Sequence, residues 1–257
     1  MNFKSRLIRF SYWRINPIIV KKYFEDESQG LSSYLKMGER GKRAGEVKKS
    51  YLRERLGNSQ LVIEVGANDG RDTIELALIF PEAVIHAIEC DVRLFSVFLA
   101  RTKAFTNVIF YPFAASDNFG FSSFYESHGG SLGSSSLLPP NLIKVKNPDI
   151  CFNSNRKVLT GKISDLIQSI DCKFVDLLWM DVQGAEFMIL DDLKSHLPRI
   201  GAIYLEVEMS ELYKGEALFP DISKLLQSHG FFIAEEFRSV EKLENVLFLN
   251  ASFHNVS

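Results

Sequence analysis

The chain has 257 residues, of which 46% are hydrophobic and 24% charged, a composition typical of a folded globular protein and not of a disordered one. Its three cysteines are widely spaced and form no Cys-x-x-Cys pair, which argues against a disulfide framework or a structural zinc site and favours a reducing, cytoplasmic compartment. We expect neither a secretory signal nor a membrane span, because no apolar run approaches the roughly 18 residues that a span needs.

The formal net charge of −2 conceals a basic segment on an acidic body. Residues 1–56 hold 14 Lys+Arg and 6 Asp+Glu, a net charge of +8, which leaves −10 for residues 57–257. We therefore divide the chain into a basic helical N-terminal arm, residues 1–56, and a body, residues 57–257. The basic arm could contact a membrane surface, a phosphorylated or nucleotide-linked substrate, a second subunit or the body itself. It could equally be a solvated helical arm without such a partner. Nucleic acid is disfavoured because the body is acidic.

From Leu61 the pattern alternates between strands and helices. We expect strands at 61–65, 83–89, 107–113, 174–180 and 202–207, with helices at 71–80, 91–105, 163–170, 184–197 and 221–230. The segments 231–237 and 245–250 are predicted to form a terminal antiparallel pair, 120–126 an edge hairpin, and 127–141 a loop rich in Gly, Ser and Pro. This alternation predicts a doubly wound, mostly parallel α/β sheet, which binds its ligands beyond the carboxyl ends of the strands.

The turn after the first strand has the glycines of a nucleotide site but an acidic lining. Gly66 and Gly70 allow a ligand to approach the backbone, whereas Asn68 takes the place of the middle glycine of the dinucleotide motif. Glu64 and Asp69 would repel a pyrophosphate. They suit a cationic nucleoside such as S-adenosylmethionine, which carries a sulfonium and an α-ammonium group.

Other acidic residues follow the later strands. Glu89, at the end of the second strand, is placed to accept hydrogen bonds from both ribose hydroxyls of a nucleoside. Asp72, Asp91 and Asp117 are better explained as helix caps or solvated strand ends.

At these residues the chain resembles the FkbM family of S-adenosylmethionine-dependent methyltransferases. The matching segments are IEVGANDG (63–70), HAIECD (86–91), FAASD (113–117), GSSS (133–136), DLLWMDVQGAE (176–186) and IYLEVE (203–208). The resemblance covers roughly residues 58–250 and implies the class I methyltransferase fold. That fold is a Rossmann-like, seven-stranded sheet whose last strand is antiparallel. The resemblance also implies methylation of a hydroxyl oxygen on a sugar, a glycan or a glycosylated small molecule.

The resemblance assigns residues to the cofactor by position. The methionyl part would be surrounded by residues of the first turn: Glu64, Gly66, Ala67, Asn68, Asp69 and Gly70. Glu89 would bind the ribose, with Cys90 beside the adenosine. Ala115 and Ser116 would lie along the adenine, and Asp181 beside the transferring methyl group. Many family members carry Lys where this chain has Met180. Residues 1–56 lie outside the resemblance, so acceptor specificity could reside in the arm.

Methyl transfer to a hydroxyl requires alignment and a group that takes the hydroxyl proton. The candidates are Asp181, Glu206 and Glu186, with Glu208 and His128 as weaker ones. Asp181 and Glu206 end neighbouring strands, where they could act as a base with a helper or hold a divalent cation. The spacing does not choose between these options. The loop 127–141 is expected to form a lid over the acceptor.

Two other functions stay open at this stage. One is a nicotinamide-dependent oxidoreductase on a similar sheet, against which the missing middle glycine and the acidic lining argue. The other is a non-catalytic scaffold that docks on anionic surfaces through its basic arm.

Overall fold

The computed structural model describes residues 47, 49–170, 172–239 and 242–254, so most of the predicted arm lies outside the described residues. The described part of the arm is Val47 and helix α4 (Lys49–Leu56). Val47 and Leu52 are buried in the same apolar cluster as Val62 of the sheet, and the Val47 amide donates to the Tyr204 hydroxyl at 3.2 Å. This end of the arm therefore packs on the body.

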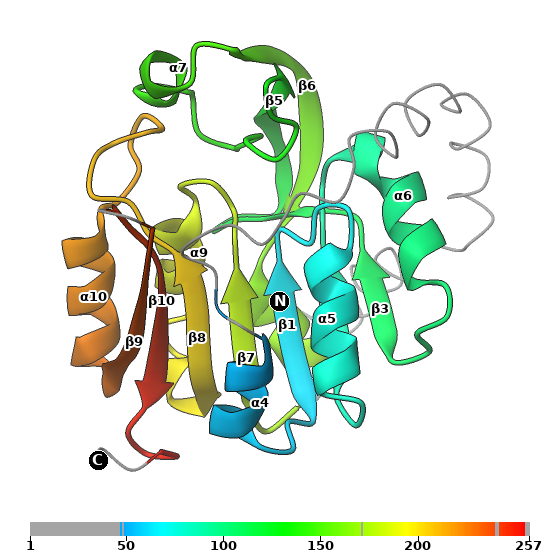
Figure 1. The fold of residues 1–257 in the computed structure, drawn as a ribbon, viewed down its shortest axis with the longest axis vertical. Helices are drawn as coiled ribbons and strands as arrows, with labels where there is room; N and C mark the ends of the chain where they lie inside the picture. The colour runs from blue at the N-terminus through cyan, green and yellow to red at the C-terminus, as the bar shows by residue number, and fades with distance from the viewer. Residues whose placement is uncertain (1–46, 48, 171, 240–241, 255–257) are drawn as a thin grey trace.

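The main sheet has seven strands, with the topology that the class I fold requires (Figure 1). In spatial order they are β3 (Val108–Tyr111), β2 (Val84–Ile88), β1 (Leu61–Val65), β7 (Val175–Met180), β8 (Ile200–Glu206), β10 (Lys242–Asn250) and β9 (Phe231–Ser239). β10 is antiparallel to both of its neighbours, whereas the pairs from β3 to β8 are all parallel. The doubly wound sheet and its antiparallel last strand are confirmed.

Both faces of this sheet are covered, which explains why its strands read as almost continuous apolar runs. Helices α4 and α5 (Arg71–Ile79) bury Leu52 and Leu76 against one face, together with Val62. Helices α8 (Ile163–Ser169), α9 (Glu186–Asp192) and α10 (Phe219–Ser228) bury apolar side chains against the other face, with Ile63. Helix α6 (Val92–Thr102) packs Phe98 against Ala67 and Ala87. Because Val62 and Ile63 point to opposite faces, one strand contributes to both cores.

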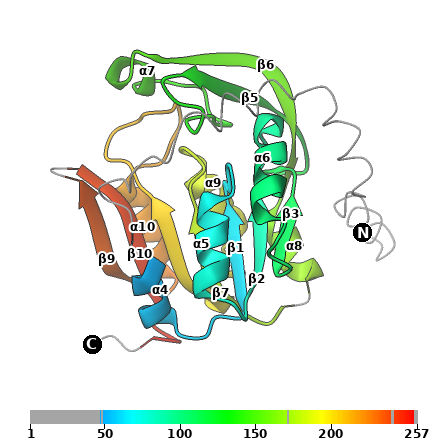
Figure 2. The same cartoon turned by 45° about the vertical axis from the view of Figure 1, so that its right-hand side comes forward.

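A second, three-stranded sheet lies over the carboxyl ends of the main strands (Figures 1 and 2). It consists of β4 (Ala114–Ala115), β6 (Ile150–Gly161) and β5 (Gly120–Gly129), and a short helix α7 (Ile143–Lys146) lies in the connection between β5 and β6. The prediction of an edge hairpin within 120–126 was wrong, since this segment is one arm of a longer hairpin whose partner is β6. The expected loop 127–141 also begins inside β5.

The observed helices differ from the predicted ones by no more than two residues at most ends, and by more at two C-terminal ends. The helix predicted at 91–105 ends at Thr102, and the one predicted at 184–197 is shortened to Glu186–Asp192, with a 3₁₀ turn at Leu197–Arg199. None of the helices within the described ranges is both long enough and apolar enough to cross a membrane.

Candidate functional site

A pocket lies where the ends of β1, β2 and β7 face the second sheet. It spans about 610 Å³ of space, including solvent at its open mouth. Six of the residues predicted to bind the cofactor line it: Gly66, Asn68, Glu89, Cys90, Ala115 and Asp181. The topology thus brings together residues that are more than 100 positions apart in the chain.

The turn after β1 is held between the ends of its two neighbouring strands. The amides of Gly66 and Ala67 both donate to the Ile88 carbonyl at 3.0 Å, and the Asp181 amide donates to the Val65 carbonyl at 3.0 Å. Gly66 has φ +86°, and a Cβ there would lie 1.9 Å from the Asp181 carbonyl oxygen. Only glycine fits at this position, because the end of β7 passes directly against it.

Glu89 ties this turn to the end of β2. One carboxylate oxygen accepts from the Asn68 amide at 2.8 Å, and the other accepts from the amides of Cys90 at 2.8 Å and Asp91 at 2.7 Å. Burial, with a contribution from the nearby Asp91 charge, raises the pKa of Glu89 to about 7. A carboxylate has about four acceptor positions, so roughly one remains here for a ligand hydroxyl.

The other predicted cofactor residues lie behind the pocket wall. Glu64 is 1% exposed and accepts from the Thr73 hydroxyl at 2.6 Å, so it joins β1 to α5 below the turn. Burial raises the pKa of Glu64 well above its ordinary value. Asp69 forms ion pairs with Arg71 and Arg101. A direct contact of Glu64 or Asp69 with a cofactor remains a prediction.

Ala67, Gly70 and Ser116 also lie outside the lining. Ala67 packs in the cluster of Phe98, and a Cβ on Gly70 would lie 3.0 Å from the ring of Phe98. Ser116 is 2% exposed, and its hydroxyl lies 3.7 Å from the Met188 sulfur. These residues pack behind the residues that line the pocket.

Part of the pocket wall comes from the segment 131–137, which connects to the second sheet. The lining residues from this segment are Leu132, Gly133, Ser135, Ser136 and Leu137. Gly133 packs against the side chain of Asn68, because a Cβ added at Gly133 would lie 3.2 Å from Asn68 Nδ2. The predicted lid therefore lies beside the candidate cofactor pocket. Phe113 and Phe124, which also line the pocket, had no distinguishing pattern in the sequence.

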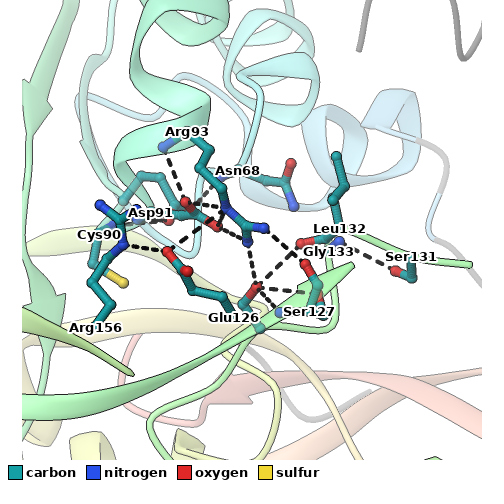
Figure 3. A network of polar contacts seen from close by, with 12 residues as sticks. Asn68, Cys90, Asp91, Arg93, Glu126, Ser127, Ser131, Leu132, Gly133 and Arg156 are labelled. Atoms are coloured by element: carbon teal, nitrogen blue, oxygen red, sulfur yellow. Dashed lines mark hydrogen bonds and ion pairs between the residues drawn. The ribbon is translucent and has the colours of Figure 1, made fainter. Parts of the chain in front are cut away.

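Arg93 joins this segment to the end of β2 (Figure 3). Its guanidinium donates to the Asp91 carboxylate, to the Ser127 carbonyl at 2.9 Å and to the Ser135 hydroxyl at 3.1 Å. Asp91 is the N-cap of α6, as expected of a capping carboxylate, and accepts from the Arg93 amide at 3.0 Å. Sequence analysis did not single out Arg93, because an arginine in the first turn of a helix carries no signal of this kind.

The predicted catalytic carboxylates Asp181 and Glu206 meet at the edge of the cofactor pocket. Gln183 Nε2 donates to Asp181 Oδ1 and to Glu206 Oε2, both at 2.7 Å. Burial, followed by the charge of Asp181, raises the pKa of Glu206 well above its ordinary value. Glu186 accepts from the Val182 amide at 3.1 Å, and burial raises its pKa to about 8. The predicted convergence of carboxylates after β7 and β8 is present in the structure.

A second, acidic cavity lies next to these carboxylates and spans about 290 Å³, including open solvent. Its polar lining consists of Gln183, Glu186, Glu206, Glu208, Tyr213 and Glu216. His128 lies elsewhere, on β5 opposite Cys151. Within the described part of the chain, no three His, Cys, Asp or Glu side chains are arranged to hold a metal ion.

Comparison with known families identifies the chain. The profile described as "Methyltransferase FkbM domain" matches residues 64–233, which include both the turn after β1 and the carboxylates after β7 and β8. The chain belongs to the FkbM methyltransferase family. It is an S-adenosylmethionine-dependent methyltransferase.

Among curated relatives of this FkbM protein is 2-O-methyltransferase NoeI from Sinorhizobium fredii (strain NBRC 101917 / NGR234). The two are 28% identical over 173 residues, which cover 65% of this chain and 71% of NoeI. A solved FkbM methyltransferase from Methylobacillus flagellatus KT aligns at 13% identity with a TM-score of 0.49. That alignment covers 75% of this chain but only 44% of the solved chain, so the solved protein extends well beyond it. Aeropyrum pernix fibrillarin with bound S-adenosyl-L-methionine aligns at 12% identity with a TM-score of 0.45, over 78% of this chain and 73% of that chain.

The residues present suit S-adenosylmethionine. Apolar side chains of Ile88, Leu94 and Phe124 offer a surface for a base, and the buried Glu89 offers an acceptor to a ribose hydroxyl. Asp181 also lines the pocket, and a carboxylate there would favour the positive charge of a sulfonium. Met180, which replaces the lysine of many family members, is fully buried in the core and adds no charge to the pocket.

Proposed function

We propose that the protein transfers a methyl group from S-adenosylmethionine to a hydroxyl oxygen of a sugar, a glycan or a glycosylated small molecule. The observation that carries this proposal is the pair of carboxylates, Asp181 and Glu206, held on one amide nitrogen beside the pocket. A sugar hydroxyl is a poor nucleophile and needs a proton acceptor at this place. The relative NoeI, named a 2-O-methyltransferase, supports oxygen as the methylated atom.

The chain's own residues would divide the work. When bound, the cofactor supplies a methyl group whose bond to sulfur breaks, with the electron pair left on sulfur, as the acceptor oxygen bonds to the methyl carbon. Glu206, whose carboxylate is held beside Asp181 by Gln183 Nε2, would take the hydroxyl proton. Asp181 lines the cofactor pocket and orients the acceptor, while Glu186 fixes the turn between them through the Val182 amide.

The acidic lining of the site limits the class of acceptor that can bind. The second cavity is lined by four glutamates, of which only Glu208 is paired with a lysine, Lys242, in the described part of the chain. The described lining holds no lysine or arginine that could pair with a phosphate, which disfavours an acceptor with a phosphate near the methylated hydroxyl. A neutral sugar is therefore favoured over a phosphorylated or nucleotide-linked one. We also propose that the protein is cytoplasmic, and that the arm, residues 1–56, contacts a membrane surface or a second copy of the chain.

The test is a methyl-transfer assay with radiolabelled S-adenosylmethionine and a panel of neutral monosaccharides, oligosaccharides and sugar phosphates. We expect label on a neutral sugar, and loss of at least about a hundredfold in rate for Asp181→Asn and Glu206→Gln, the range of a lost general base. Glu82→Gln, an exposed acid in the turn before β2, is the matched control and should retain full rate. Transfer to nitrogen or carbon acceptors alone would contradict the proposal.

A further inference from the structure

Gln183 occupies an unusual place in the site. Among the described residues it is the one that lines both the cofactor pocket and the acidic cavity. Its backbone has φ +55°, and the other non-glycine residue of the described chain with positive φ, Asn68, lines the same pocket. Left-handed backbone at a non-glycine residue is uncommon, and it persists where surrounding contacts impose it.

The contacts of Gln183 involve all of its polar atoms except the backbone nitrogen. Nε2 donates to Asp181 and Glu206, Oε1 accepts from the Tyr213 hydroxyl at 3.2 Å, and the backbone carbonyl accepts from the Ser136 hydroxyl at 2.7 Å. Tyr213 also lies 2.7 Å from the Ser134 carbonyl. Gln183 thus connects the carboxylate pair to the segment 131–137 of the pocket wall.

The orientation of this amide is fixed by the charges around it. Reversing it would place Oε1 against the oxygens of both Asp181 and Glu206, which is repulsive while either is ionised. The other charged groups around the pair are Glu186, Glu208 with Lys242, and Glu216, whose carboxylate accepts from the Leu212 and Tyr213 amides. Gln183 Nε2 is therefore a neutral donor placed among carboxyl groups.

We propose that Gln183 is a positioning residue for methyl transfer. It holds Asp181 at the cofactor pocket and Glu206 at the acidic cavity, so that an acceptor hydroxyl meets the methyl group between them. This inference rests on the proposed function, because it assumes that Asp181 lies near the sulfonium.

The test compares the affinities of S-adenosylmethionine and S-adenosylhomocysteine by calorimetry at one pH. The two ligands differ in a methyl group and a positive charge, so their affinity ratio reports how well Asp181 is directed at the sulfur. Gln183→Met keeps the length of the side chain and removes its donor. We expect it to lower the preference for S-adenosylmethionine roughly threefold or more, with little change in the affinity for S-adenosylhomocysteine. Gln60→Met, at an exposed site before β1, is the control.

A double-mutant cycle separates positioning from a general loss of structure. In an Asp181→Asn background, Gln183→Met should have no further effect on the affinity ratio. Additive effects, or equal losses of affinity for both ligands, would overturn the role of Gln183. Failure of the unaltered protein to bind either ligand would instead overturn the proposed function.

Discussion

The Asn68 amide donates to the Glu89 carboxylate at 2.8 Å, and this bond joins the turn after β1 to the end of β2. Asn68 has a left-handed backbone, with φ +49°. The carboxylate is thereby fixed before any ligand arrives, since its second oxygen is held by two further amides. Fixing an acceptor in advance reduces the entropy lost when a ribose hydroxyl binds to it.

The first prediction is a pH dependence of cofactor affinity through Glu89. Its pKa is raised to about 7, so the carboxyl is largely protonated at pH 6 and ionised at pH 8. The ionised form is the better acceptor, and the affinity for S-adenosylhomocysteine should therefore rise about tenfold from pH 6 to pH 8. Glu89→Gln should bind more weakly and show a flat profile over this range. A profile that keeps its slope in Glu89→Gln would assign the titration to another group.

The positions of the main strands follow from sequence because they are buried on both faces. The strand LVIEV is buried on both faces, so its sequence shows no alternation of apolar and polar residues. Its nearly continuous apolar run still marks it as a buried strand. A parallel sheet then brings the residues after each strand to one edge, which is why Gly66, Glu89 and Asp181 were predicted to meet. The proximity of these residues could be predicted from the sheet topology alone, without knowledge of side-chain contacts.

The second sheet and the polar contacts around the site were beyond such reasoning. β6 contains the polar run NSNRK, and its pairing with β5 is set across a connection of 20 residues (130–149) rather than by a tight turn. The bridging role of Gln183 depends on a left-handed backbone, and a glutamine gives no sign of one in sequence. Nor does the sequence show that Glu64 faces Thr73 and lies behind the pocket wall.

The second prediction concerns Arg93, which joins the segment 131–137 to the pocket. Lysine cannot reproduce the forked contacts to the Ser127 carbonyl and the Ser135 hydroxyl. We expect Arg93→Lys to weaken S-adenosylhomocysteine binding about tenfold, which corresponds to about 1.4 kcal/mol. Arg156→Lys is the matched control, because Arg156 pairs with Glu126 in the same network, whereas Arg93 donates to Ser135, which lines the pocket. Equal effects of the two substitutions would show that the network acts only on stability.

The third prediction is a pH-dependent effect of Glu186 on stability. Its folded-state pKa of about 8 exceeds the ordinary value of 4.5, so the folded protein holds an extra proton between these values. The corresponding stability is present at low pH and is lost as the pH rises toward 8. Glu186→Gln keeps an acceptor for the Val182 amide and removes the titration.

The variant should therefore match the unaltered protein at pH 5 and gain relative stability by pH 9, about 4 kcal/mol at most. Urea denaturation at the two pH values measures the difference. A constant difference between the proteins would exclude Glu186 as the titrating group.

The fourth prediction tests the buried pair below the first turn. Thr73 is fully buried, and its hydroxyl at 2.6 Å is the partner that the structure gives to Glu64 Oε2. Thr73→Val keeps the shape of the side chain but leaves this buried acceptor unpaired. The expected loss is about 1–3 kcal/mol in the free energy of unfolding.

Thr73→Ser, which keeps the hydroxyl and removes only a methyl group, should lose less than Thr73→Val in the same urea titration. Because Glu64 lies behind the pocket wall and does not line it, both variants should retain S-adenosylhomocysteine affinity within about threefold when measured well below their unfolding midpoints. A larger loss of affinity in Thr73→Val alone would show that Glu64 reaches the cofactor directly, as the family resemblance implies.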